Sequence, residues 1–258
     1  MISITVITCT YNASAVIERT LRSVLRQTYL HVEHLIIDGQ SKDDTAEKIE
    51  RYIGESHAAK TGHVVRFISE PDKGLYDAMN KGLRLAQNDY LVYLNAGDIF
   101  PGERTLETVA ASVGEDERMP GVLYGETDIV DDEGVFIRHR RLSPPRNLTW
   151  EDFRHGMLVC HQAFYALTSI ARTIPYNIEY RYSADVDWCI RVMKQSAQEH
   201  RPLRNINAVV VNYLEGGMSI QHHRASLKER FRVMKSHYGL FPTVMQHLWF
   251  AVRAVVKR

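Results

Sequence analysis

LVYLNAGD, residues 91–98, changes abruptly from an apolar run to a polar turn. Its first half is typical of a buried strand, whereas Asn95, Gly97 and Asp98 are residue types that tolerate turn geometry. In open α/β sheets, ligands bind outside the carboxyl ends of the strands. Two interpretations of Asp98 therefore stay open at this point: it closes a turn, or it serves a binding site.

The same pattern recurs on the N-terminal side of this stretch. Apolar, β-branched runs alternate there with segments that carry apolar residues at helical spacing. The predicted strands are 2–9, 32–38, 64–69 and 89–95, and the predicted helices between them are 14–27, 43–58 and 74–86. This alternation predicts an α/β fold with a doubly wound, mostly parallel, Rossmann-like sheet.

The pattern becomes mixed beyond residue 100. Two apolar segments flank the turn at 131–134 and predict a β-hairpin. The further expected elements are a helix at 104–114, a strand at 161–167, a helix at 183–198, a strand at 204–213 and a basic helix at 223–238. No repeat and no linker divides the chain, so we expect one domain over 1–221 followed by a helical appendage.

Charge is distributed unevenly along the chain. Residues 222–258 hold eight Lys and Arg against one Glu, whereas residues 1–221 hold 24 against 30. The basic tail predicts either an anionic partner, such as a membrane surface or a diphosphate, or a solvated helix. No nucleic-acid partner is expected. Residues 240–258 are too short and too charged to span a bilayer, and they are expected to lie on a membrane or to pack on protein.

Neither a signal peptide nor an apolar run of bilayer length is visible in the sequence. We therefore expect either a cytoplasmic protein or one that sits on the inner face of the plasma membrane.

Polar residues follow each of the early strands. Because the carboxyl ends of parallel strands share one edge of a sheet, Asp38, Asp72 and Asp98 are expected around one cleft. An acid after the second strand is well placed to accept hydrogen bonds from ribose hydroxyls. Carboxylates repel a diphosphate unless a cation is present, and hard oxygen ligands favour Mg²⁺ or Mn²⁺. Turn chemistry is the alternative explanation for the same residues.

Several motifs in order resemble the family 2 glycosyltransferases of GT-A fold. They are TVITCTYN, DGQSKDDT, SEPDKGLYDAMNKGL, YLVYLNAGD, CHQAFYAL, YNIEYRYSADVDWCIRV and GGMS, which together cover roughly residues 2–220. The similarity is to bacterial enzymes that assemble colanic acid and other exopolysaccharides, capsules or O-antigens. It implies a nucleotide-binding half at 1–100 and an acceptor-binding half at 101–221. The charge pattern adds a basic amphipathic helical tail at 222–258.

The resemblance implies a role for each matched position. Residues implied to contact the nucleotide are Thr10, Tyr11, Asn12, Asp38, Asp72 and Lys73. Asp98 is implied to hold Mn²⁺ or Mg²⁺, while Asn95, His161 and Gln162 are implied to face the sugar or the acceptor. The donor would be a nucleotide-diphosphate sugar of the UDP class, and the acceptor a glycan or a polyprenyl-diphosphate-linked sugar.

Two positions depart from the family pattern. Relatives carry more acids in the fourth-strand motif, whereas this chain has Asn95, whose neutral oxygen cannot share the charge of a divalent ion. Relatives also carry Glu-Asp where this chain has Ala184-Asp185. Asp185 is the expected general base at a helix N-terminus, with Asp187 as the alternative.

Two rival functions stay open on sequence alone. A sugar-phosphate nucleotidyltransferase also uses an α/β sheet and a metal, but it needs a Gly-rich basic segment after the first strand, which TCTYNASA lacks. A catalytically impaired scaffold is the other rival, since Asn95 and Ala184 replace acids.

Overall fold

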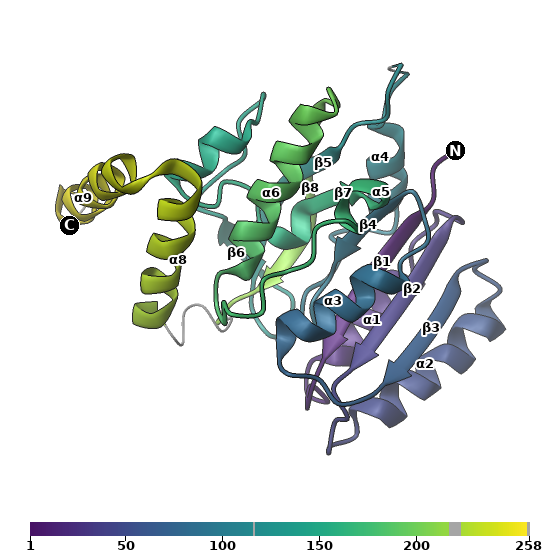
Figure 1. The fold of residues 1–258 in the computed structure, drawn as a ribbon. Coiled ribbons are helices and arrows are strands. Elements are labelled where there is room, and N and C mark those ends of the chain that lie inside the picture. The colour runs from purple at the N-terminus through teal and green to yellow at the C-terminus, as the bar shows by residue number, and fades with distance from the viewer. Residues whose placement is uncertain (116, 217–222, 257–258) are drawn as a thin grey trace.

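The structure is a computed structural model that describes residues 1–115, 117–216 and 223–256 (Figure 1). Eight strands form one sheet in the order β3-β2-β1-β4-β7-β5-β6, and β8 pairs with β5 off this path. Helices cover both faces of the sheet (Figure 1). The fold is therefore the α/β, mostly parallel arrangement that the sequence predicted.

The N-terminal half of the sheet is parallel. Its strands are β1 (Ile4–Thr10), β2 (Val32–Asp38), β3 (Val64–Ser69) and β4 (Tyr90–Tyr93). β1 lies between β2 and β4, and the register places Thr10 opposite Asp38 and Ile7 opposite Tyr93. The strands consequently end at a common edge, where the polar residues that follow them meet.

Alternate residues of β2 explain why helices pack on both faces. Ile36 packs with Ile17 of α1 (Ile17–Leu25) and Ile49 of α2 (Thr45–Ala59). Ile37 faces α3 (Leu75–Leu85) on the opposite side, where Gly82 allows close approach. A Cβ on Gly82 would come within 2.6 Å of Ile7, so the absence of a side chain there lets α3 lie directly on β1.

The C-terminal half of the sheet is mixed. β5 (Val122–Val130) pairs antiparallel with β6 (Phe136–His139) and β7 (Phe164–Leu167), and parallel with β8 (Leu203–Leu214). The hairpin predicted around 131–134 is confirmed by the β5–β6 pairing. β7 also pairs antiparallel with β4, which joins the two halves into one sheet.

The remaining elements are α4 (Thr105–Ala111), α5 (Thr168–Ala171), α6 (Ala184–Gln198) and the short 3₁₀ helices η1 (Trp150–His155) and η2 (His161–Ala163). The strand predicted at 161–167 is wrong in its first part. The backbone N–H of Ala163 donates to the carbonyl of Cys160 at 2.9 Å, so residues 161–163 form a turn before β7 begins. This turn carries two of the predicted site residues to the sheet edge.

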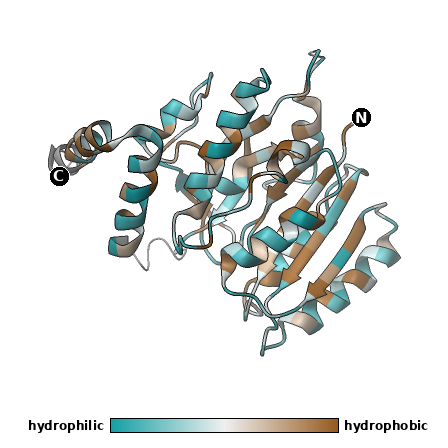
Figure 2. Cartoon of the chain, in the orientation of Figure 1, coloured by the Kyte–Doolittle hydropathy of each residue, from teal (hydrophilic) through white to brown (hydrophobic). Residues whose placement is uncertain are grey.

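Two helices form the C-terminal segment, α8 (His223–Tyr238) and α9 (Leu240–Val256). α8 packs against the body, since Val233 and Met234 are buried and Tyr238 stacks on Trp150 with ring centroids 5.6 Å apart. α9 extends away from the sheet and carries both apolar and polar residues (Figures 1 and 2). Within the described ranges, no helix is both long and apolar enough to cross a membrane.

Candidate active site

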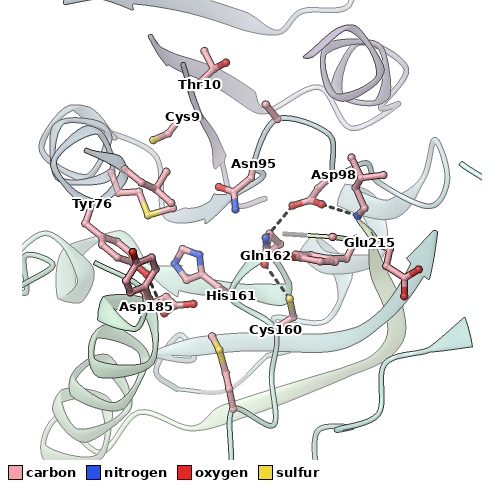
Figure 3. Close-up of a pocket in the computed structure, with 18 of the residues that line it drawn as sticks. Cys9, Thr10, Tyr76, Asn95, Asp98, Cys160, His161, Gln162, Asp185 and Glu215 are labelled. Atoms are coloured by element: carbon pink, nitrogen blue, oxygen red, sulfur yellow. Dashed lines mark hydrogen bonds between the residues drawn. The ribbon is translucent and has the colours of Figure 1, made fainter. Parts of the chain in front are cut away.

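A cavity of about 540 Å³ opens at the carboxyl edge of the sheet. Its walls come from the ends of β1, β4 and β8, from η2, and from α3, α6 and α8. The predicted site residues among those that line it are Thr10, Tyr11, Asn95, Asp98, His161, Gln162 and Asp185. Figure 3 shows Asn95 in the middle, with Asp98 and Gln162 to one side of it and Asp185 and Tyr76 to the other. The volume is typical of a small-molecule site.

Three lining residues present buried polar atoms that have no hydrogen-bond partner in the described structure. They are the hydroxyl oxygen of Thr10, at the end of β1, the side-chain oxygen Oδ1 of Asn95, just after β4, and the side-chain nitrogen Nε of Arg230, on α8. A buried polar group without a partner costs about 1–3 kcal/mol. Such atoms at the wall of a cavity are ready to bond a polar ligand.

Asp38 lies just outside this cavity and is completely buried. Its carboxylate accepts hydrogen bonds from the hydroxyls of Ser41 and Ser69, the latter at 2.7 Å. Next to it, Gly39 allows the Asp72 carboxylate and the Tyr11 ring to close over the end of β2, since a Cβ there would be 2.4 Å from Asp72. Asp38, Asp72 and Tyr11, three of the residues implied to contact the nucleotide, therefore lie close together at the end of β2.

The other nucleotide candidates stay at the periphery. Asn12, Asp38, Asp72 and Lys73 are not among the described residues that line the cavity. Asn12 accepts the backbone N–H of Lys42 at 2.7 Å, and the backbone N–H of Lys73 donates to Asp77 at 2.9 Å. Both contacts fix loops around the cavity mouth, and their nucleotide role stays a prediction.

Asp98 is buried with both carboxylate oxygens occupied. Oδ2 accepts the side-chain amide of Gln162 and Oδ1 accepts the backbone N–H of Leu214, each at 2.9 Å (Figure 3). Burial raises the pKa of Asp98 to about 7, although the two hydrogen bonds oppose that rise. Asp98 therefore ties the end of β4 to η2 and to the end of β8.

The described residues around Asp98 offer few ligands to a divalent cation. Among the described residues, no group of three or more His, Cys, Asp or Glu side chains is placed to hold a metal ion. Mg²⁺ and Mn²⁺ prefer several hard oxygen ligands, and the single carboxylate here is already bonded to two N–H donors. The side chains present thus do not fit a metal in this arrangement, and the metal role of Asp98 stays a prediction.

Asp185 lies in the first turn of α6 and lines the cavity. Its Oδ1 accepts the hydroxyl of Tyr76 at 3.2 Å, which leaves Oδ2 without a hydrogen bond from the described residues. The geometry of Asp185 suits a base that takes a proton from a bound hydroxyl.

Asp187 lies in the same turn but is directed elsewhere. It accepts His237 at 2.8 Å and pairs with Arg191 at 2.7 Å, and it is not among the described residues that line the cavity. Burial pushes the pKa of Asp187 up, but the hydrogen bonds from His237 and Arg191 outweigh it and hold the pKa below its usual value. Asp187 therefore joins α6 to α8, and each of its carboxylate oxygens is bonded to a side chain that does not line the cavity.

His161 is held in an aromatic cluster on the cavity floor. Its Nε2 bonds the Tyr176 hydroxyl at 2.6 Å, and its ring stacks on Tyr93 at 5.0 Å. Burial lowers the pKa of His161 to about 4, even though nearby Asp185 acts to raise it. His161 is therefore neutral near pH 7. Trp188 is completely buried behind this cluster, as expected for a core residue.

Three cavity residues were not singled out from the sequence. Tyr76 bonds Asp185, and Arg140 and Arg230 bring positive charge to the wall. Tyr76 lies within the SEPDKGLYDAMN motif, so its place in that motif could have identified it as a site residue. Arg230 lies on a helix that reads as a basic tail, and only the packing of α8 places it at the cavity.

The sequence profile described as Glycosyl transferase family 2 matches residues 5–177. A PGL/p-HBAD biosynthesis glycosyltransferase of Mycobacterium tuberculosis (strain ATCC 25177 / H37Ra) is 33% identical over 212 residues, covering 81% of this chain and 76% of the relative. An uncharacterized glycosyltransferase of M. tuberculosis (strain ATCC 25618 / H37Rv) is 29% identical over 196 residues, covering 73% and 68%.

Two solved structures illustrate the likeness in fold. Staphylococcus aureus TarS 1–349 in complex with UDP-GlcNAc superposes with a TM-score of 0.70 at 17% identity, over 90% of this chain and 64% of that chain. The mannosyltransferase PcManGT from Pyrobaculum calidifontis, in complex with GDP-Man and Mn²⁺, gives 0.63 at 18% identity, over 96% and 70%. At these identities the likeness shows the fold alone, which is of GT-A type.

Proposed function

Because this chain belongs to glycosyl transferase family 2 and is a glycosyltransferase, we propose that it moves a sugar from a nucleotide-diphosphate donor to a hydroxyl group. The donor is of the UDP class, and the reaction inverts the anomeric configuration. The observation that carries this proposal is the shared cavity. It places the unpartnered oxygens of Thr10 and Asn95 together with the Asp185 carboxylate around one space of ligand size.

In the proposed reaction, Asp185 accepts the proton of the acceptor hydroxyl. The hydroxyl oxygen attacks the anomeric carbon from the face opposite the diphosphate. The bond between that carbon and the diphosphate oxygen breaks, and the nucleoside diphosphate leaves with the electron pair. A positioned base contributes about 10²–10⁴-fold to such a rate. Asp187 is the weaker candidate, because His237 and Arg191 occupy its carboxylate.

The nucleoside is proposed to bind at the group formed by Tyr11, Asp38 and Asp72. Tyr11 is exposed at the cavity wall and offers a ring face to a base. Asn95 would contact the donor sugar. Neutral His161 would line the acceptor side of the cavity beside Asp185. A divalent cation, Mn²⁺ or Mg²⁺, would neutralise diphosphate charge when bound. The described side chains do not form a site for this cation, and the proton transfer to Asp185 does not require one.

The acceptor is proposed to be a lipid-linked or growing glycan of bacterial exopolysaccharide, capsule or O-antigen assembly. α9 supports this proposal, because its exposed apolar residues recur at helical spacing along one face. They are Leu240, Phe241, Val244, Met245, Leu248 and Trp249. Together with the basic charge of residues 222–258, this face suits an anionic membrane surface, where a cytoplasmic enzyme would meet a lipid-linked acceptor.

The experiment that tests this function is a pair of matched substitutions in α6. Asp185→Asn is expected to abolish release of the nucleoside diphosphate from a donor while nucleotide binding stays intact. Asp187→Asn serves as the control of identical chemistry two residues away, and it is expected to lower stability but to retain turnover once folded. A folded Asp185→Asn protein with wild-type turnover would sink the assignment of the base.

A further inference from the structure

The Arg230 side chain on α8 has an unusual environment. Its Nε is fully buried and has no hydrogen-bond partner in the described structure, and the guanidinium forms no ion pair with the described residues. The side chain lines the same cavity as Asp185 and Thr10. Burial lowers the pKa of Arg230, while neighbouring Asp185 acts to raise it. The residue as a whole is half-buried, but a buried donor is usually hydrogen-bonded, so this guanidinium is arranged for a partner that the described residues do not supply.

The other arginines of the cavity are already committed or lie at its rim. Arg140 donates to the carbonyls of Leu142 and Met157, each at 2.7 Å, and to that of Leu158 at 3.2 Å. Its guanidinium thus braces the loop between β6 and η2. Arg181 is exposed on the segment before α6. Arg230 is therefore the half-buried lining arginine whose buried Nε has no hydrogen-bond partner in the described structure.

A cation is needed in this cavity for a chemical reason. The departing nucleoside diphosphate gains negative charge as its bond to the sugar breaks, and that charge must be stabilised within the site. Among the described residues, Asp98 is not joined by further His, Cys, Asp or Glu side chains that would hold a cation with it, and each of its oxygens already accepts one N–H group. A guanidinium suits the task, because its planar fork of N–H donors matches phosphate oxygens.

α8 is a rigid support for such a group. Glu229, the preceding residue, accepts three backbone N–H groups from residues 181–183, and Val233 is completely buried. The helix therefore fixes Arg230 relative to Asp185, and both groups belong to the same wall. Both side chains line the same cavity, and no direct ion pair joins them in the described structure.

From this juxtaposition we propose that Arg230 is the anion subsite of the cleft and binds the diphosphate of the nucleotide-sugar donor. This inference rests on the proposed function. It assigns to the first helix of the C-terminal segment a direct part in holding the leaving group. A polyprenyl diphosphate acceptor carries the same chemical group, so the test must separate the two sources.

The test is calorimetric titration of UDP, uridine and farnesyl diphosphate into the full chain. In the wild type, UDP is expected to bind more tightly than uridine. Arg230→Gln is expected to lower the affinity for UDP by about 10- to 100-fold and to leave the affinity for uridine unchanged. Arg230→Lys is expected to recover part of the loss, because it keeps the charge but not the fork. Arg232→Gln, an exposed arginine on the same helix, is the matched control.

Thermal unfolding separates this role from a structural one. Arg230→Gln is expected to keep the Tm, because it removes a half-buried cation that has no partner among the described residues, whereas loss of a structural contact would lower the Tm. Unchanged preference for UDP over uridine in folded Arg230→Gln would overturn the proposal. Loss of farnesyl diphosphate binding with intact UDP binding would also overturn it, in favour of an acceptor subsite. Failure of the wild type to bind any nucleotide would instead count against the proposed function.

Discussion

Glu229 on α8 accepts the backbone N–H of Tyr182 at 2.7 Å, three residues before Asp185. The same carboxylate accepts the N–H groups of Arg181 at 2.9 Å and Ser183 at 3.1 Å. These are the residues that lead into α6, whose first turn carries Asp185. A helix that reads as a tail in the sequence thus holds the segment that aims the proposed base.

Glu229→Gln is expected to impair catalysis more than donor binding. The amide can accept with one oxygen only, and its NH₂ group opposes the backbone N–H groups that the carboxylate binds. The free energy of unfolding should fall by about 1–3 kcal/mol. Steady-state kinetics should show a lower kcat with little change in the KM for the donor. Lys228→Gln on the exposed side of α8 is the control, and a changed donor KM with unchanged kcat would contradict a positioning role.

Mn²⁺ alone is expected to bind the protein weakly, at millimolar concentration or above, because both oxygens of Asp98 already accept N–H groups. Electron paramagnetic resonance of free Mn²⁺ measures this directly, with and without UDP. Gln162→Glu places a second carboxylate beside Asp98 and is expected to raise Mn²⁺ affinity. Tight Mn²⁺ binding by the wild type without nucleotide would show that Asp98 is a preformed metal ligand.

Stability is expected to fall as the pH drops from 6.5 toward 4, with His34 among its causes. His34 is completely buried between Thr8 at 3.0 Å and Tyr52 at 2.7 Å. Burial lowers the pKa of His34 to about 3, with a smaller push from His63. As the pH falls, His34 therefore takes up a proton in the unfolded chain before it does so in the folded chain. In that window each such group lowers the free energy of unfolding by about 1.4 kcal/mol for every unit by which the pH falls.

Denaturant unfolding of His34→Gln at several pH values tests this linkage. The substitution removes one titrating group, so the slope of unfolding free energy against pH should decrease by about 1.4 kcal/mol per unit. Identical slopes for wild type and variant below pH 6.5 would show that His34 is not kept neutral by burial.

The exposed face of α9 is expected to bind anionic lipid. Phe241 is 77% exposed and Trp249 is 58% exposed on the same side of the helix. The double variant Phe241→Ser, Trp249→Ser should lose cosedimentation with phosphatidylglycerol vesicles, while phosphatidylcholine should bind little of either protein. Phe136→Ser on β6 is the control, since Phe136 is 53% exposed. Wild-type binding by the α9 variant, or a change of oligomeric state instead, would contradict a membrane role.

The sequence was sufficient where a local pattern determined the structure. Apolar β-branched runs predicted the parallel strands, and the strand-end residues Thr10, Asn95 and Asp98 do meet at one cavity. Asp38 and Asp72, which were expected around the same cleft as Asp98, are not among the described residues that line it. These successes share a cause, because a parallel sheet brings all its carboxyl ends to one edge regardless of detailed packing.

Long-range contacts were not visible in the sequence. Nothing near Asp98 indicates that Gln162, 64 residues away, bonds it. Likewise, Glu229 and Arg230 look like ordinary members of a charged helix until α8 is packed against α6. The choice between Asp185 and Asp187 also depends on such contacts, since the two acids share a helix turn and differ only in their partners.

The most direct measurement is calorimetric titration of UDP into the purified full chain, with GDP as the comparison. The account predicts binding of one UDP per chain, in preference to GDP, that survives Asp185→Asn. Preference for GDP would keep the transferase and change the donor class. Binding of neither nucleotide by a demonstrably folded protein would contradict the central claim that this cavity is a nucleotide-sugar site.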